Sequence, residues 1–265
     1  MQLVLAEKPS VARELAKHLG AKQRRDGWFE GAGYQVTWAY GHLAGLKAPD
    51  DYDSALKRWS VEALPFIPAQ FELKLEGDKT AQRQFALIKK LMRSAKSLIC
   101  ATDAGREGEL IFRYIVSLAG CESKPAERLW LSSLTPRAIS VAFNNLRPAA
   151  DFQPLYDAAR CRSEADWIIG MNGTRYFTVR FGTQGVLWSI GRVQTPVLAM
   201  IVAQDDQIRH FAPVPFWELV TTYRDVQFGF AGKGTADGHS FASGKDAVAL
   251  LATVKGVPLE ITSVV

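Results

Sequence analysis

Four acidic side chains in two short segments have the chemistry to bind a metal ion. Glu7 lies in Ala-Glu-Lys-Pro-Ser near the start of the chain, and Asp103, Glu107 and Glu109 lie in the glycine-bearing segment 101–109. Clustered carboxylates repel one another, and a bound dication relieves that repulsion. Mg²⁺ prefers oxygen ligands, usually takes one or two protein carboxylates, and binds water and phosphate oxygens besides. These residues therefore predict a Mg²⁺ site that leaves room for water and phosphate oxygens as further ligands.

A solvated acidic loop is the simpler alternative, because Glu107 and Glu109 also favour the positive N-terminus of a following helix. The apolar runs at 2–6 and 97–102 predict two strands that end at Glu7 and at Asp103. Ligands of parallel α/β sheets bind beyond the carboxyl ends of the strands. If the two strands are neighbours, the carboxylates converge at one edge, which favours the metal site.

The chain predicts an α/β fold up to about residue 147, because strands alternate with helices. The further elements expected there are a helix at 11–21 with Ser10 as its N-cap, a hairpin at 27–41, helices at 80–95 and 109–120, a strand at 128–133 and a helix that begins at Thr135. Beyond Arg147-Pro148 the pattern becomes helical, and from Pro213 strands return around a short helix, with a final strand at 259–265. We therefore expect three domains, at 1–148, 149–212 and 213–265.

The composition indicates an ordinary globular protein, with 48% hydrophobic and 22% charged residues. No apolar run approaches the roughly 18 residues of a membrane span, and the start lacks a secretory signal, so the expected location is the cytoplasm. The three cysteines show no C-x-x-C spacing, which argues against zinc and against a disulfide framework. A net charge of +5 is compatible with a polyanionic partner but does not establish one.

Five motifs, in order over roughly residues 1–220, carry a resemblance to a known family. They are MQLVLAEKPSVA, GHLAGL, ATDAGREGELI, ADWIIGMNGTRYFT and the stretch that begins SIGRVQTPVLAM. Together they resemble the Toprim domain and DNA cleft of type IA DNA topoisomerases, in particular the bacterial topoisomerase III group. The resemblance implies a Rossmann-like, mostly parallel Toprim sheet with flanking helices, then a mainly helical DNA-binding domain and the start of a β-rich arch domain.

The resemblance also implies roles for the acidic residues. Glu7 would lie beside the scissile phosphate and assist proton transfer, Lys8 would contact that phosphate, and Asp103 and Glu107 would hold Mg²⁺ together with Glu7. Many Toprim domains carry Asp-x-Asp at this point, whereas here Gly105 stands in place of the second aspartate. We therefore expect fewer direct protein–metal bonds, more water ligands and weaker Mg²⁺ binding.

Single-stranded DNA is the expected partner of the cleft segments, with no membrane partner. Because aromatic faces and cations bind strands of any sequence, Arg58 and Trp59 are candidate contacts, although Trp59 equally fits a core position. His42 is assigned only proximity to the site. The remaining candidate DNA contacts are Arg162, Asp166 and Arg175, for which structural ion pairing is the alternative, and Ser189, Ile190, Gly191, Arg192, Val193 and Gln194.

The nucleophile of this family is a tyrosine in a Tyr-Pro-Arg context, which forms a covalent bond to the 5′ phosphate. None of the seven tyrosines here is followed by Pro-Arg. The chain is therefore predicted to be the N-terminal portion of a bacterial, nucleoid-associated topoisomerase III, inactive alone. With its tyrosine domain it would cut, pass and reseal single DNA strands with Mg²⁺ and without ATP. The alternatives are a Toprim-type nuclease or primase-like enzyme and a non-catalytic DNA-binding module.

Overall fold

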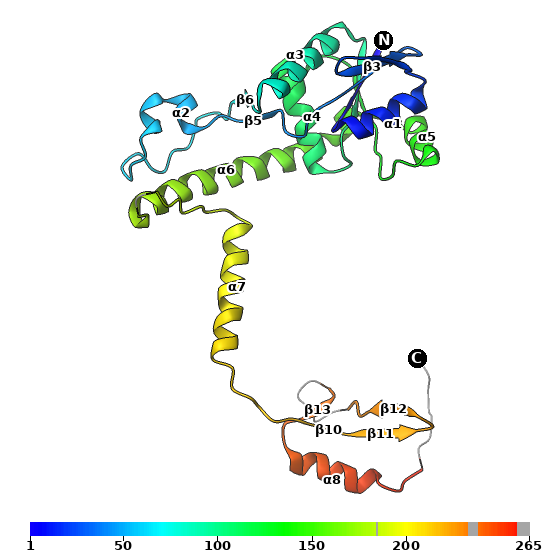
Figure 1. Cartoon of the computed structure of the whole chain (residues 1–265), viewed down its shortest axis with the longest axis vertical. Helices are drawn as coiled ribbons and strands as arrows, with labels where there is room; N and C mark the ends of the chain where they lie inside the picture. The colour runs from blue at the N-terminus through cyan, green and yellow to red at the C-terminus, as the bar shows by residue number, and fades with distance from the viewer. Residues whose placement is uncertain (184, 233–237, 259–265) are drawn as a thin grey trace. The chain divides into compact units, whose positions relative to one another are not determined.

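The computed structural model describes residues 1–183, 185–232 and 238–258 of the chain, in two units (Figure 1). The first unit runs from Met1 to Leu198 and the second from Ala199 to Val265. Each is described by itself below. None of the described helices is long and apolar enough to cross a membrane.

A seven-stranded sheet in the order β2-β3-β4-β1-β7-β8-β9 forms the centre of the first unit. Its four central strands, β4, β1, β7 and β8, are parallel, and antiparallel strands flank them on both sides. The strand bounds are β1 Gln2–Ala6, β2 Gln23–Arg25, β3 Trp28–Gly31, β4 Tyr34–Trp38, β7 Ser97–Ala101, β8 Ala126–Arg128 and β9 Arg147–Pro148. The predicted mostly parallel α/β sheet is thereby confirmed.

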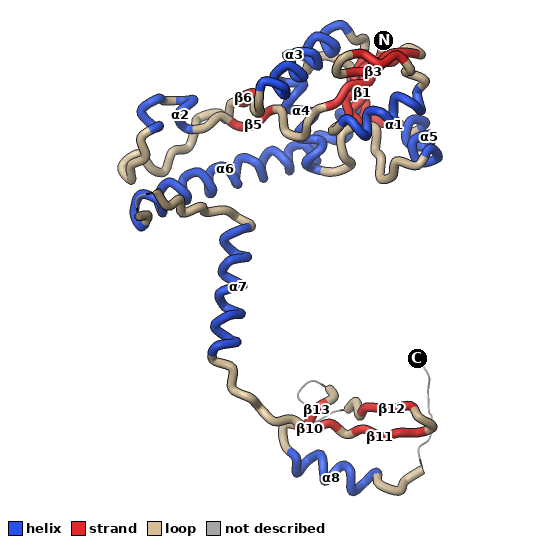
Figure 2. The backbone as a smooth tube through the Cα atoms, viewed as in Figure 1, coloured by secondary structure: helices blue, strands red, loops and turns tan. Residues whose placement is uncertain are grey.

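Helices cover both faces of this sheet, because successive residues of the buried strands point to opposite faces. Leu3 and Leu5 of β1 pack with α3 and α4, whereas Val4 and Ala6 pack with α1 and α5. Figure 2 shows these helices around the strands. Their bounds are α1 Pro9–Leu19, α3 Lys79–Ser94, α4 Arg106–Ala119 and α5 Pro136–Asn144. The layered core thus holds the carboxyl ends of the parallel strands at one edge.

The long helix α6, Gln153–Phe181, carries three of the candidate DNA contacts, Arg162, Asp166 and Arg175. Its Trp167 donates a hydrogen bond from Nε1 to the Lys47 carbonyl at 3.0 Å, and Asn172 bonds both the amide and the carbonyl of Phe66. The segment before α3 is thereby attached to α6. This segment contains β5 Ala44–Leu46, α2 Pro49–Tyr52, the 3₁₀ turn η1 Ser54–Lys57 and β6 Leu73–Leu75. A second 3₁₀ turn, η2 Ala149–Phe152, leads into α6.

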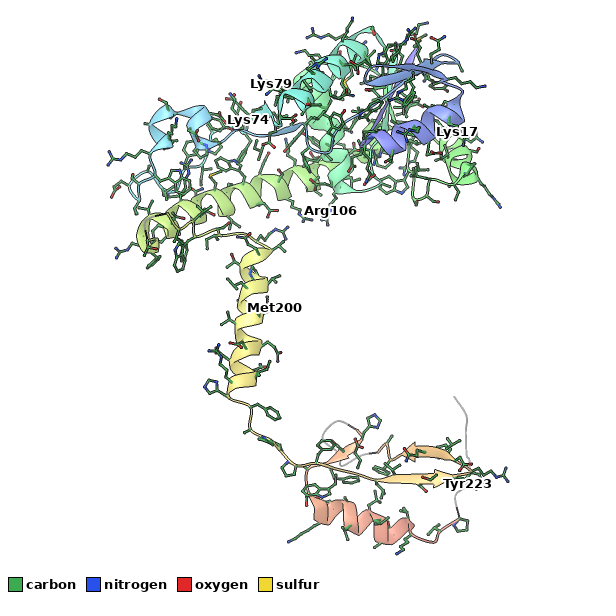
Figure 3. The ribbon with its side chains drawn as sticks, viewed as in Figure 1. Lys17, Lys74, Lys79, Arg106, Met200 and Tyr223 are labelled. Atoms are coloured by element: carbon green, nitrogen blue, oxygen red, sulfur yellow. The ribbon has the colours of Figure 1, made fainter. Side chains whose placement is uncertain are left out.

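The helix α7, Gln194–Arg209, continues into the second unit, where most described side chains are exposed, including Met200 and Tyr223 (Figure 3). Two small antiparallel pairs form there, β10 with β13 and β11 with β12. The bounds are β10 Trp217–Glu218, β11 Val220–Tyr223, β12 Val226–Gly229, β13 Ser240–Phe241 and α8 Gly244–Val254. The strand expected at 259–265 lies outside the described residues.

Three local predictions differ from the structure. Ser10 is not the N-cap of α1, because the helix already begins at Pro9, whose fixed φ suits a first helical position. The strand expected at 128–133 ends at Arg128, so Trp130 belongs to a loop. The helix expected at 109–120 begins at Arg106, which brings Glu107 and Glu109 into its first turn.

Candidate functional site

Glu7 and Asp103 lie side by side at the carboxyl edge of the sheet, as their positions after two strands predicted. The strands β1 and β7 are parallel neighbours with Ala6 opposite Ala101. The Asp103 backbone N–H donates a hydrogen bond to Glu7 Oε2 at 3.0 Å. This bond joins two loops that are remote in the sequence and holds one oxygen of Glu7 in a defined place.

A lysine and a histidine accompany the carboxylates at this edge. Lys8 Nζ lies 4.0 Å from Asp103 Oδ2, and His42 Nε2 lies 2.9 Å from Glu107 Oε1. Asp103 and Glu107 remain open to solvent, with side chains 60% and 62% exposed. His42 therefore has the proximity expected of it, and it contacts one of the predicted metal ligands.

The half-buried carboxylate of Glu7 and the exposed carboxylates of Asp103 and Glu107 fit a hard cation that keeps much of its hydration. In the part of the chain that the structure describes, no three His, Cys, Asp or Glu side chains come together in a group that could hold a metal ion. An open site of one or two carboxylates, with water and phosphate as further ligands, matches this donor set.

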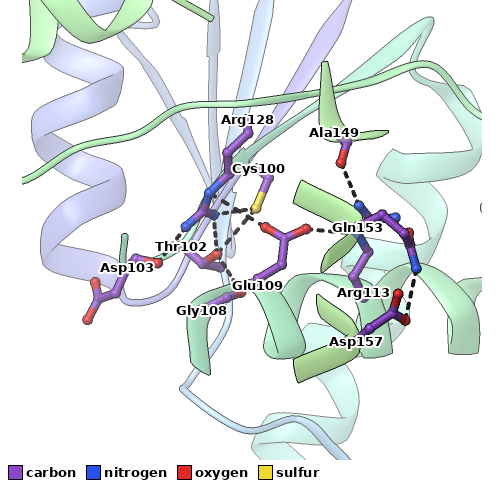
Figure 4. A network of polar contacts seen from close by, with 10 residues as sticks. All are labelled: Cys100, Thr102, Asp103, Gly108, Glu109, Arg113, Arg128, Ala149, Gln153 and Asp157. Carbon is purple, nitrogen blue, oxygen red and sulfur yellow. Dashed lines mark hydrogen bonds and ion pairs between the residues drawn. The ribbon is translucent and has the colours of Figure 1, made fainter. Parts of the chain in front are cut away.

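Glu109 does not belong to this exposed group, because its side chain is only 1% exposed. Arg113 Nε lies 2.9 Å from its Oε1, and Arg128 Nε lies 3.6 Å from its Oε2 (Figure 4). Arg128 is fully buried and donates further hydrogen bonds to the Thr102 hydroxyl at 2.8 Å and to the Asp103 carbonyl at 2.5 Å. The buried pair therefore supports the loop that carries Asp103.

Sequence reasoning missed Arg128, although an arginine before the apolar Leu-Trp-Leu was a visible signal. Its guanidinium also bonds the buried Cys100 sulfur. Burial raises the pKa of the Cys100 thiol, so the sulfur remains neutral beside the cation.

A close backbone approach fixes the other side of the Asp103 loop. A Cβ on Gly108 would lie 2.1 Å from the Asp103 carbonyl oxygen, and the Gly108 carbonyl accepts a hydrogen bond from Thr102 Oγ1 at 2.7 Å. Glycine is therefore required where α4 passes the loop.

Gly108→Ala is expected to lower the free energy of unfolding by about 1–3 kcal/mol, because the added methyl must displace the Asp103 backbone. Urea unfolding of the chain measures the change. Gly105→Ala is the matched control, since no atom lies within 4 Å of a Cβ at Gly105. Equal stability of the two variants would contradict the close packing at Gly108.

Asp166 orients Arg192 across the predicted DNA cleft. Arg192 Nε donates to Asp166 Oδ1 at 2.5 Å and Nη2 donates to Oδ2 at 3.3 Å. Arg162 lies 3.8 Å from the same carboxylate. The hydrogen bond from Arg192 holds the pKa of Asp166 below its usual range, with the charges of both arginines acting in the same direction. The ion pair thus sets the direction of a candidate phosphate contact.

The segment Ser189–Gln194 is held at both ends by hydrogen bonds within the first unit. Gln194 Nε2 donates to the Ser189 carbonyl at 3.0 Å, and the Gly191 N–H donates to Thr195 Oγ1 at 3.0 Å. Thr174 Oγ1 accepts from the Ile190 N–H at 2.9 Å. Side chains of α6 therefore fix the backbone of this segment, whereas Val193 is exposed.

The order of this segment should be lost at low pH. The lowered pKa of Asp166 means that its ion pair contributes above the ordinary aspartate pKa of about 3.9 and is lost only as the pH falls through the lower folded value. Iodide quenching of the nearby Trp188 should therefore stay constant down to about pH 4 and rise below it. Asp166→Asn should show the raised quenching already at neutral pH. A variant that quenches like the wild type would contradict the role of the pair.

Arg175 contributes to the packing of the first unit, which supports the structural alternative. It is 4% exposed, donates to the Leu56 carbonyl at 2.8 Å, lies 3.6 Å from Asp50 and covers the Trp59 ring at 5.2 Å. Burial lowers the pKa of this guanidinium, and Asp50 opposes the shift. The prediction of a phosphate contact at Arg175 is corrected accordingly, since its donors point inward. Arg58 and Trp59 stay at the surface, at the rim of one cavity.

A cavity of about 340 Å³ is lined both by His42 and Glu107 from the sheet edge and by Arg162 and Asp166 from α6. The structure therefore brings together two groups of residues that the sequence placed in separate predicted domains.

Two family models match the chain, the Toprim domain over residues 2–134 and DNA topoisomerase over residues 150–265. The chain belongs to the Toprim-containing type IA DNA topoisomerases. The Toprim domain of this family is metal-dependent, which agrees with the carboxylates at the sheet edge. The confirmed family accounts for the order of the five sequence motifs.

Relatives named DNA topoisomerase 3 show the same relationship along most of the chain. The one from Bacillus licheniformis is 43% identical over 241 residues, which are 90% of this chain and 32% of that protein. The one from Staphylococcus haemolyticus is 44% identical over 228 residues, 85% of this chain and 31% of that protein. The chain thus spans about a third of the length of these relatives.

A solved structure shares the fold. Full-length topoisomerase I from Thermotoga maritima matches with a TM-score of 0.60 and 20% identity, over 94% of this chain and 37% of that chain. At this identity the likeness shows the fold alone.

Proposed function

We propose that this chain is the Mg²⁺-binding and strand-binding portion of a type IA topoisomerase III. The observation that carries the proposal is the cavity that His42 and Glu107 line together with Arg162 and Asp166. Carboxylates suited to a cation and an arginine suited to phosphate line one space, as a metal-assisted reaction on a DNA strand requires. We further propose three domains, at 1–148, 149–212 and 213–265.

Each residue at the sheet edge would have a different role at the scissile phosphate. Asp103 and Glu107, with Glu7, would hold Mg²⁺, and the bound ion would neutralise charge that develops on the phosphate. Lys8, half exposed, would bind a phosphate oxygen as a point charge. Glu7 would move a proton to or from the leaving 3′ oxygen through the carboxylate oxygen that does not accept from Asp103. Arg192, fixed by Asp166, would bind the backbone of the strand, with Arg58 and Trp59 as further contacts.

The single-strand preference and the dependence on Mg²⁺ can be tested on the chain itself. The chain should bind single-stranded DNA more tightly than a duplex of the same length, with affinity that falls steeply with salt. Mg²⁺ should protect the Asp103 loop from amide hydrogen exchange. No covalent adduct with DNA should form, because no tyrosine here has the family's context. An adduct would contradict the absence of the nucleophilic tyrosine from this chain, whereas Mg²⁺-dependent cleavage abolished by Glu7→Gln would support a nuclease. DNA binding that is indifferent to Asp103→Asn, together with no Mg²⁺ binding, would support a non-catalytic module.

A further inference from the structure

A second cavity lies at the same edge of the sheet, beside the end of β4. It encloses about 740 Å³ and is lined by Arg24, Arg25, Asp26, Gly27, Trp38, Tyr40, Thr80, Arg83, Gln84 and Leu87. None of these residues has a part in the site described above.

Topology places this cavity beside the metal edge. Arg24 and Arg25 end β2, Asp26 and Gly27 connect it to β3, and Trp28 at the start of β3 pairs with Thr37 near the end of β4. Since β4 runs parallel to β1, the cavity lies where the parallel strands end. Tyr40 follows β4, and the next residue, Gly41, donates its N–H to the Glu7 carbonyl at 3.3 Å. A polymer that crosses the metal edge therefore reaches the cavity within a short distance.

The charge of the cavity suits a phosphate. Arg24 and Arg83 are exposed and form no ion pair within the described residues, whereas Arg25 lies 3.8 Å from Glu30. Asp26 is the one carboxylate among the described lining residues. Two guanidiniums without an ion pair among the described residues therefore line the cavity. Each can donate two parallel hydrogen bonds to the oxygens of a phosphate.

The wall of the cavity also offers a group that suits a base. The side chain of Gln84 is buried, and its Nε2 donates to the Gly27 carbonyl, the Thr37 hydroxyl and the Trp38 carbonyl at 3.1, 3.1 and 2.8 Å. Its Oε1 accepts no hydrogen bond within the described residues. The Gln84 Oε1 is thus an unused acceptor on the cavity wall, whereas the Trp38 ring packs with the core on the opposite face of the sheet.

Tyr40 completes the cavity with an open aromatic face. It is 47% exposed, and no ring contact to it is found among the described residues. Aromatic faces stack on bases of any sequence. We propose that this cavity binds a nucleotide of the single DNA strand next to the one at the metal edge, with Arg24 and Arg83 on its phosphate and Tyr40 stacked on its base. The inference rests on the proposed function, because it needs the strand to cross that edge.

The test compares an Arg24→Ala/Arg83→Ala double variant with the wild-type chain. Binding of an end-labelled single-stranded oligothymidylate is followed by fluorescence anisotropy at several salt concentrations. The double variant should bind about tenfold more weakly. The slope of log affinity against log salt should become shallower by about 1.4, since each phosphate contact on a single strand contributes about 0.7. Tyr40→Leu should weaken binding about tenfold without changing the slope, because stacking releases no counterions.

Arg93→Ala is the matched control. Arg93 is an exposed arginine in the last turn of the same helix, about 15 Å from Arg83. It should leave affinity and slope unchanged. If the double variant binds like Arg93→Ala, the inference about the cavity is overturned while the proposed function stands. The same conclusion follows if an equal concentration of inorganic phosphate displaces the oligonucleotide. A wild-type chain that binds no single-stranded DNA would overturn the proposed function and the inference with it.

Discussion

Arg128→Met is expected to lower the free energy of unfolding by about 3–5 kcal/mol, because it leaves a buried carboxylate with one partner fewer. Arg128 is fully buried, and its Nε is the group nearest to Glu109 Oε2, which accepts no hydrogen bond within the described residues. Methionine fills much of the volume but cannot donate to the Asp103 carbonyl either. Urea unfolding followed by tryptophan fluorescence measures the loss.

Two further variants separate the buried pair from simple packing. Arg137→Met removes an exposed arginine next in the chain and should change stability by less than about 0.5 kcal/mol. Glu109→Gln combined with Arg128→Met should cost clearly less than the sum of the single changes, since the uncompensated charge is then gone. Strict additivity of the two changes, or an Arg128→Met variant as stable as Arg137→Met, would refute the coupling between Arg128 and Glu109.

The contrast between Glu7 and Glu109 shows how far the sequence could specify the site. Glu7 and Asp103 each follow a short apolar run, and parallel strands place such residues at one edge, so their proximity was predictable. Glu109 has the same side chain in an equally acidic segment. Its burial depends on Arg128, nineteen positions later on another strand, and on the face of α4 that packs inward. No local pattern encodes that pairing.

Arg175 and Arg192, two of the predicted DNA contacts, also show that the burial of a side chain was not predictable from its local sequence. Both were predicted contacts in segments with a family resemblance. Asp166 and Arg192 form an exposed pair, whereas Arg175 is enclosed by Leu56, Asp50 and Trp59 from a segment more than a hundred residues earlier. Burial of an arginine is a property of the assembled fold, since its aliphatic stem and charged head fit a surface or an interior according to what packs on it.

The Mg²⁺ affinity of the sheet edge should respond in opposite directions to Gly105→Asp and Asp103→Asn. Gly105 precedes α4 with extended backbone, φ 172° and ψ 179°, and no atom lies within 4 Å of a Cβ there. Aspartate therefore fits without strain, favours the start of the helix and supplies the carboxylate that this chain lacks beside Asp103. We expect about ten- to a hundredfold tighter Mg²⁺ binding in Gly105→Asp and a comparable loss in Asp103→Asn.

Calorimetric titration of the chain with Mg²⁺ measures both changes, and Gly105→Asn provides the control of equal shape without charge. Without metal, the added carboxylate of Gly105→Asp should repel Asp103 and lower the melting temperature relative to Gly105→Asn. With saturating Mg²⁺ the order should reverse, because tighter binding to the folded state adds stability by mass action. If Gly105→Asp and Gly105→Asn bound Mg²⁺ equally, the metal would not lie at Asp103, and the carboxyl edge of the sheet would have to bind phosphate through its cations alone.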